Sequence, residues 1–206
     1  MMIKKVLVTG GNGDIAKAIS ENLNQKYIVE TPERNELDVS SIESVDSFFS
    51  NRSFDIVINN AGTLYSSTVV DSDPHLWIRD ISVNLIGTYL VSRASVRKNK
   101  RVRVINISST AAFNSYLDWT SYCASKAGVL KLSMGMVKDG YDVVTICPGA
   151  IDTKLRDEVD IVNPNVMTVS EGIKPIIEAV EGVYESGNVI FYRKGEKRLI
   201  ENSDSL

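Results

Sequence analysis

Short apolar segments rich in β-branched residues alternate with amphipathic segments along this chain of 206 residues. The apolar segments span residues 3–9, 26–30, 54–60, 101–108, 141–147 and 188–192. Such alternation is typical of βαβ units, in which helices cover both faces of a parallel sheet. We therefore expect an α/β fold built on a doubly wound parallel sheet.

Helical periodicity occupies the intervals between these expected strands. Apolar residues recur every four positions at Ile15, Ile19 and Leu23, which predicts the first helix. Further helices are expected over 42–49, about 76–97, 120–138 and 170–185. A capping box of Ser40 and Glu43 is expected to start the helix over 42–49, and Gly140 to end the helix over 120–138. Residues 154–169 predict a loop with one short helix, and 201–206 a frayed tail.

Composition limits the classes of protein to consider. A chain of 206 residues that is 43% hydrophobic can bury a core and is expected to form one domain, residues 1–206. The net charge of −3 gives no basic field for nucleic acid, and no apolar run approaches the ~18 residues of a membrane span. Two cysteines and His75 are too few for a disulfide framework or a zinc site. Without a secretory leader pattern, we expect a cytoplasmic protein that binds neither nucleic acid, membrane nor metal.

The first expected strand runs into a glycine-rich turn, TGGNGDIA, at residues 9–16. Gly10 and Gly13 bracket the turn, and the helix that follows directs its N-terminal amides toward a bound anion. At the first strand–helix junction of an α/β chain this predicts a Rossmann-type dinucleotide site. Its expected pyrophosphate contacts are Gly10, Asn12, Gly13, Asp14 and Ile15. Such a turn can also simply connect a strand to a helix.

Selection between NAD and NADP is expected at the end of the second strand. Glu30 lies twenty residues after Gly10 and could accept from a ribose hydroxyl. Arg34 and the Thr31 hydroxyl lie in the next loop and could bind a 2′-phosphate instead. We lean slightly to NADPH, with both answers open. Asp38 follows, and with Val39 it is expected near the adenine.

Tyr122 and Lys126 lie four residues apart in a segment with a helical pattern, so their side chains share one face. A free phenol has a pKa of about 10, and a neighbouring cation favours its ionised form. If this face borders a cleft, Tyr122 is a candidate general acid and base. Such a pair is otherwise most often an exposed Tyr beside a solvated Lys.

Five motifs in one order resemble the short-chain dehydrogenase/reductase family, specifically over about residues 3–153. They are the turn at 9–16, NNAG at 59–62, Asn84 in ISVNLIG, Ser109 thirteen residues before the Tyr122/Lys126 pair, and PGAIDT at 148–153. Two features depart from the family. Asp14 and Ala16 occupy positions where the family has Gly, and no helix fits between the second strand and Asp38. The resemblance therefore implies a trimmed member.

The resemblance implies a role for each motif. Tyr122 transfers the proton, Lys126 supports it and holds the nicotinamide ribose, and Ser109 donates to the substrate oxygen. Asn84 keeps a helix kink and a water that relays protons to Lys126. The remaining implied cofactor contacts are Asn60, Ala61, Gly62, Pro148, Gly149, Ile151 and Thr153. Each of these residues also has an alternative structural role. The Ser can cap a strand end, the Asn can be an ordinary helix residue, and the glycines can simply form turns.

The expected function is an NAD(P)-dependent oxidoreductase that reduces a ketone or oxidises a secondary alcohol, as a homodimer or homotetramer paired through its two long helices. Two alternatives remain. One is a dinucleotide-binding sensor without turnover. The other is a nucleotide-sugar epimerase or dehydratase, which the segment ERNELDV weakly favours and the lack of a substrate domain opposes. Specificity is expected in loops 111–119 and 154–169, with even odds that Trp119 faces the substrate.

Overall fold

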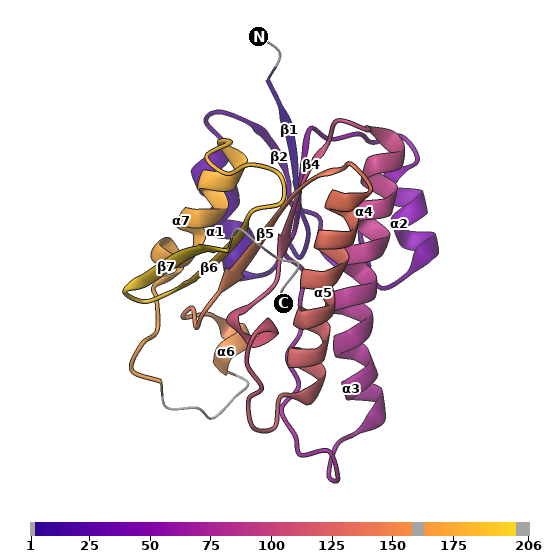
Figure 1. The fold of residues 1–206 in the computed structure, drawn as a ribbon. Helices are drawn as coiled ribbons and strands as arrows, with labels where there is room; N and C mark the ends of the chain where they lie inside the picture. The colour runs from indigo at the N-terminus through magenta and orange to yellow at the C-terminus, as the bar shows by residue number, and fades with distance from the viewer. Residues whose placement is uncertain (1–2, 158–162, 201–206) are drawn as a thin grey trace.

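A seven-stranded sheet forms the centre of the computed structural model, which describes residues 3–157 and 163–200 (Figure 1). The strand order is β2-β1-β3-β4-β5-β6-β7, and the first six strands are parallel. The strand bounds are β1 Lys5–Val8, β2 Ile28–Glu30, β3 Ile56–Asn59, β4 Arg103–Ile107, β5 Asp142–Pro148, β6 Val189–Arg193 and β7 Glu196–Ile200. The predicted doubly wound α/β fold is confirmed, and each of the six predicted strands is present.

Helices cover both faces of the sheet, because alternate strand residues face opposite sides (Figure 1). On one face, α1 (Asp14–Leu23) and α7 (Val169–Val180) pack against residues such as Val6 and Val8. On the other face, α2 (Ile42–Phe49), α4 (Gly87–Lys98) and α5 (Thr120–Lys138) pack against Leu7 and its neighbours. Val6, Leu7 and Val8 are fully buried, so this strand is apolar on both sides, as a central parallel strand requires.

Most helix ends agree with the sequence expectation. Helix α5 spans the predicted residues, and Gly140, with a φ of 88°, follows its end. Helix α7 ends at Val180, earlier than the predicted residue 185. Residues 201–206, the predicted frayed tail, lie outside the described residues. Within the described part of the chain, no helix is both long enough and apolar enough to cross a membrane.

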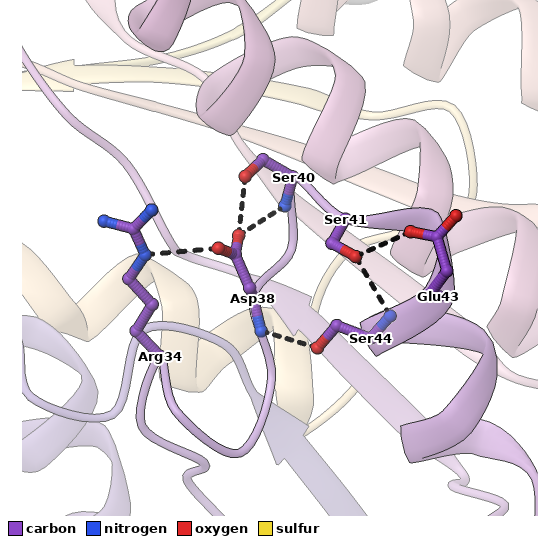
Figure 2. A network of polar contacts seen from close by, with 6 residues as sticks. All are labelled: Arg34, Asp38, Ser40, Ser41, Glu43 and Ser44. Carbon is purple, nitrogen blue, oxygen red and sulfur yellow. Dashed lines mark hydrogen bonds and ion pairs between the residues drawn. The ribbon is translucent and has the colours of Figure 1, made fainter.

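The capping box predicted for α2 is wrong by one residue. Ser40 is held by Asp38, whose Oδ1 accepts from the Ser40 amide at 2.9 Å and from its hydroxyl at 2.6 Å (Figure 2). Ser41 therefore caps the helix, and its Oγ accepts from the Ser44 amide at 3.1 Å. The same hydroxyl donates to Glu43 at 3.0 Å. The competing acceptor at Asp38 explains the shift of the cap.

Strand β7 was not predicted. It pairs antiparallel with β6 through a two-residue turn at Lys194 and Gly195. Gly195 has a φ of 76°, a conformation that glycine adopts without strain. The three central residues of β7 are exposed at the open edge of the sheet. Two of them are charged and one is apolar. An alternating apolar pattern is therefore absent, and only the Lys-Gly turn signals the hairpin.

The predicted helix over about 76–97 is one continuous helical rod with an irregular centre. Helix α3 (Pro74–Asp80) leads into a π-helical turn at Ile81–Ile86, and α4 continues the rod to Lys98. Asn84 lies inside the π-helical turn and is fully buried. Single π turns inside α-helices occur frequently at functional sites. The helix irregularity implied at Asn84 is therefore present as a π turn.

Two loops at the carboxyl ends of β1 and β3 are joined by Thr9. Its hydroxyl oxygen accepts from the backbone amides of Asn60 at 3.0 Å and Ala61 at 2.9 Å. The Asn60 side-chain amide donates in return to the Thr9 carbonyl at 3.0 Å. Because β1 has β2 on one side and β3 on the other, these loops flank the point where the strand order reverses. Ligands of open α/β sheets bind at such a point.

Candidate active site

A cleft of about 520 Å³ lies along the carboxyl ends of the parallel strands. Its walls come from segments far apart in sequence, namely the turn after β1, the loops after β2, β3, β4 and β5, and helix α5. All the predicted cofactor residues line it: Gly10, Asn12, Gly13, Asp14, Ile15, Arg34, Asp38, Val39, Asn60, Ala61, Gly62, Tyr122, Lys126, Pro148, Gly149, Ile151 and Thr153. Ser109 also lines the cleft, and Asn84 does not.

The turn after β1 approaches its neighbours too closely for side chains. Gly10 has a φ of 78°, and a Cβ there would lie 3.0 Å from the Ala61 Cα. A Cβ on Gly11 would lie 2.1 Å from the Thr31 carbonyl oxygen, so this position also requires glycine. Gly13 caps α1 without any side-chain hydrogen bond. The first amides of α1 are therefore not occupied by a capping side chain, which suits a phosphate ligand.

Asp14 stands where the resemblance implies glycine, and its carboxylate is engaged by the chain itself. Its Oδ2 accepts from the backbone amide of Lys154 at 2.9 Å. Lys154 begins the short helix α6 (Lys154–Asp157), which realises part of the predicted loop with one short helix. Residues 158–162 of that loop lie outside the described residues. Asp14 thus joins the glycine-rich turn to the start of the expected substrate loop.

Glu30 and Arg34, the two candidates for cofactor selection, differ in orientation. Glu30 forms an ion pair with Arg52 at 3.5 Å and is absent from the cleft lining, as is Thr31. Arg34 lines the cleft, and its Nε donates to Asp38 Oδ2 at 3.3 Å (Figure 2). The two terminal nitrogens of Arg34 point away from Asp38 in Figure 2 and remain available to a ligand.

The Asp38 carboxylate is held in its ionised form. Burial alone would raise the pKa of Asp38, but hydrogen bonds from Ser40 and Arg34 outweigh burial and keep the pKa below its ordinary value. Asp38 therefore fixes the Arg34 side chain through charge as well as through the hydrogen bond.

Ser109, Tyr122 and Lys126 meet at the centre of the cleft. Ser109 Oγ accepts from the Ala111 amide at 3.1 Å and caps a 3₁₀ turn at Thr110–Ala112. Lys126 is 5% exposed, and its ammonium donates to the Ile107 carbonyl at 2.9 Å and lies 5.5 Å from the centre of the Tyr122 ring. The helical spacing of Tyr122 and Lys126 thus directs both side chains into the cleft.

Burial dominates the protonation of this pair. It raises the pKa of Tyr122 to about 12, although a hydrogen bond with Ser109 opposes the rise. Burial also lowers the pKa of Lys126 to about 8, against raising contributions from Cys147 and Asp80. The expected effect of Lys126 on Tyr122 stays a prediction, since burial dominates the pKa of Tyr122 in the chain alone. Tyr122 is a protonated phenol at neutral pH, which is the form that a proton donor needs.

Asn84 lies behind the cleft wall and organises it. Its Oδ1 accepts from the Thr63 amide at 2.8 Å, while its Nδ2 donates to the Thr63 carbonyl at 2.9 Å and to Ser125 Oγ at 3.0 Å. These bonds join the π-helical turn to the loop after β3 and to α5.

Asp80 was missed by sequence reasoning. It is fully buried, and it accepts from Thr63 Oγ1 at 2.7 Å, from the Tyr65 amide at 2.8 Å and from Ser121 Oγ at 2.8 Å. Asp80 and Asn84 are one helical turn apart and bind the same loop. A carboxylate four residues before the family's Asn could have signalled this role.

The aromatic candidates separate clearly. Trp119 lines the cleft, and its ring meets the Tyr122 ring edge to face, with centroids 5.8 Å apart. Trp77 donates from its indole nitrogen to Thr120 at 3.0 Å, and Phe113 packs on Phe191, both outside the cleft lining. His75 is exposed, and the described residues contain no group of three or more side chains that could hold a metal ion.

Comparison with known proteins agrees with this arrangement. The family model described as short chain dehydrogenase matches residues 35–161. The 3-oxoacyl-[acyl-carrier-protein] reductase FabG of Aquifex aeolicus is 30% identical over 162 residues, which cover 73% of this chain and 65% of the reductase. An uncharacterized oxidoreductase of Staphylococcus saprophyticus is 31% identical over 172 residues, covering 76% of this chain and 71% of that protein.

Solved structures give the same fold. A short chain dehydrogenase from Burkholderia cenocepacia in complex with NADP has a TM-score of 0.79 at 25% identity, covering 88% of this chain and 86% of the other. A small-chain dehydrogenase in complex with NADPH has a TM-score of 0.85 at 20% identity, covering 94% and 98%. Because the family model matches more than half of its length, the chain belongs to the short-chain dehydrogenase family of oxidoreductases.

Proposed function

We propose that this protein is an NAD(P)-dependent oxidoreductase that reduces a ketone or oxidises a secondary alcohol, with Tyr122 as the proton donor and acceptor. The observation that carries the proposal is the convergence of Ser109, Tyr122 and Lys126 on one cleft with the glycine-rich turn after β1. The relatives support the general chemistry, since those with a printed activity are reductases or dehydrogenases.

The residues of the cleft fit a dinucleotide. The backbone at Gly10 and Gly11 leaves no room for side chains, and the start of α1 offers amides without a capping side chain. We propose NADPH as the preferred cofactor, because Arg34 lines the cleft while Glu30 is paired with Arg52 outside it. Solved structures of similar fold contain NADP, NADPH or NADH, which supports a nicotinamide dinucleotide in general.

In the proposed reaction, the nicotinamide supplies a hydride to the carbonyl carbon when it is bound. The Ser109 hydroxyl donates a hydrogen bond to the carbonyl oxygen, where negative charge develops. Tyr122 then transfers its phenolic proton to that oxygen, so the ketone becomes a secondary alcohol. Lys126 stabilises the resulting phenolate and contacts the nicotinamide ribose. The buried Asn84 positions Lys126 and the loop after β3, and in the reverse direction Tyr122 accepts the proton.

We propose one NAD(P)-binding domain over residues 1–206, with the segment about 154–169 as its substrate loop. The bond from Lys154 to Asp14 supports this, since it holds the start of that segment against the cofactor turn.

The test is carbonyl-dependent oxidation of NADPH, followed by absorbance with a panel of ketones, in the wild type and in Tyr122→Phe. We expect turnover in the variant to fall by at least ~10²-fold, because a positioned proton donor is lost, while the NADPH dissociation constant stays within about twofold. Wild-type turnover in Tyr122→Phe would remove the phenol from the mechanism.

A further inference from the structure

The strongest unexplained feature of the cleft is a cation that has no partner among the described residues. Arg79 comes from α3 and lines the cleft, and its Nε is buried. Within residues 3–157 and 163–200, its guanidinium makes no hydrogen bond or ion pair. Arginine offers only donors and stays charged at all relevant pH values. A partly buried guanidinium that faces a cleft without an acceptor is a feature that ligand binding would explain.

The nearby carboxylates are engaged elsewhere. Asp80 is the next residue, but its oxygens accept from Thr63, Tyr65 and Ser121. In the cleft lining, Asp14 accepts from Lys154 and Asp38 from Arg34, both at the cofactor end. The described part of the chain therefore provides no counter-ion for Arg79.

A second donor in the same cleft is also unpaired. The indole Nε1 of Trp119 is buried and has no acceptor among the described residues. The Trp119 ring packs against the Tyr122 ring, with centroids 5.8 Å apart, so Trp119 borders the residue proposed as proton donor. Asp80, which follows Arg79, accepts from Ser121, two residues after Trp119, so the two donors come from adjoining segments. Leu64 and Val83 also line the cleft. The cleft thus combines apolar walls with two donors that have no partner among the described residues.

We propose that Arg79 and the indole N–H of Trp119 bind a carboxylate of the substrate, which makes the substrate an oxo acid or the corresponding hydroxy acid. A guanidinium matches the two oxygens of a planar carboxylate, and one cation balances one negative charge. A phosphate dianion would carry one negative charge more than Arg79 alone balances. This assignment rests on the proposed function for the carbonyl chemistry, while the anion site itself is independent of turnover.

The experiment compares each oxo acid with its neutral methyl ester. Acetoacetate, 4-oxopentanoate and their methyl esters are titrated calorimetrically into the NADP⁺-bound protein, where no reduction occurs, and are then assayed with NADPH. In the wild type, we expect the acid whose chain length fits the cleft to bind at least tenfold tighter than its methyl ester. Arg79→Gln is expected to weaken acid binding by about 10- to 100-fold, the range of a lost charge-assisted hydrogen bond, and ester binding by less than twofold.

Two further variants make the test specific. Trp119→Phe keeps an aromatic ring beside Tyr122 but removes the N–H, and it is expected to weaken acid binding less than Arg79→Gln does. Arg97→Gln removes a charge from an exposed position on α4 outside the cleft lining, and it is expected to change neither ligand. Equal losses in Arg79→Gln and Arg97→Gln would mean that net charge, and no site at Arg79, determines binding.

Failure of this inference differs from failure of the proposed function. Reduction of neutral ketones without any Arg79-dependent preference for acids would overturn the carboxylate site and leave the oxidoreductase. Arg79-dependent binding of an acid that is never reduced would keep the site and overturn the reaction. Absence of acid binding in the wild type would overturn the site. Tighter, Arg79-dependent binding of dihydroxyacetone phosphate would assign the site to phosphate instead.

Discussion

Replacing Lys126 with Met is expected to change how the stability of the protein depends on pH. Lys126 is 5% exposed, and burial lowers the pKa of its ammonium from an ordinary 10.5 to about 8. In the folded state, Lys126 therefore loses its proton near pH 8. In the unfolded state it stays protonated up to about pH 10.5. Met has a similar length and no proton to lose, so the variant removes this linkage without leaving a large cavity.

The sign and size of the effect follow from proton linkage. Between about pH 8 and 10.5 the unfolded wild type binds more protons than the folded one, so its free energy of unfolding rises with pH. The penalty of the charged Lys126 is full below pH 8 and disappears above 10.5. Within this window, each pH unit raises the free energy of unfolding by up to about 1.4 kcal/mol. The total rise between pH 7 and 9.5 is about 2 kcal/mol.

The assay is urea unfolding of the wild type and Lys126→Met at several pH values from 7 to 9.5, followed by circular dichroism. Tyr122 limits the upper end, because its pKa is raised from 10.0 to about 12 and its own linkage acts above pH 10. Over this range, the free energy of unfolding of the wild type is expected to rise by about 2 kcal/mol relative to that of the variant. If the difference in unfolding free energy between the wild type and Lys126→Met does not change with pH, the conclusion that burial lowers the pKa of Lys126 is wrong.

Two other predictions concern the cofactor and the assembly. Arg34→Ala is expected to weaken NADPH binding by about tenfold and NADH binding little, since only the phosphorylated ribose uses the guanidinium. If the wild type prefers NADH and Arg34→Ala leaves the NADPH affinity unchanged, then Glu30 and not Arg34 selects between the two cofactors. The exposed apolar residues Ile78, Ile86 and Tyr89 lie along α3, the π-helical turn and α4, and are 55%, 44% and 47% exposed, so we expect a symmetric dimer or tetramer. Light scattering that detects only the 22.7 kDa chain at micromolar concentration would argue against assembly.

Features with a local cause were predictable from the sequence. Strands at the centre of the sheet, such as β1 and β3, are buried on both faces, so they stand out as apolar runs. The turn at Gly10 and the Tyr122/Lys126 pair were predictable because backbone conformation and helical spacing are local properties. Strand β7 lies at the open edge with exposed side chains, so it has no such apolar run.

Features that depend on the positions of particular side chains in the folded structure could not be predicted from the sequence. Ser40 and Ser41 are equivalent caps by pattern, and the choice depends on where the Asp38 carboxylate lies. Asp80 gains its role from Thr63, Tyr65 and Ser121, which the chain alone does not indicate as neighbours. The pKa values of Tyr122 and Lys126 depend on burial, which spacing does not give.

The π-helical turn at Ile81–Ile86 has a consequence for insertions and deletions in this rod. A π turn accommodates about one residue more than the α-helix around it, and each α-helical residue rotates the chain by ~100° about the helix axis. Forcing the same residues into regular α-helix would turn α3 by about that angle relative to α4, so Arg79 would leave the cleft and Asp80 would leave the loop at Thr63. Deleting a single residue here would restore regular α-helix and leave α3 facing nearly its present direction. The extra residue of the π turn therefore determines which α3 side chains reach the cleft.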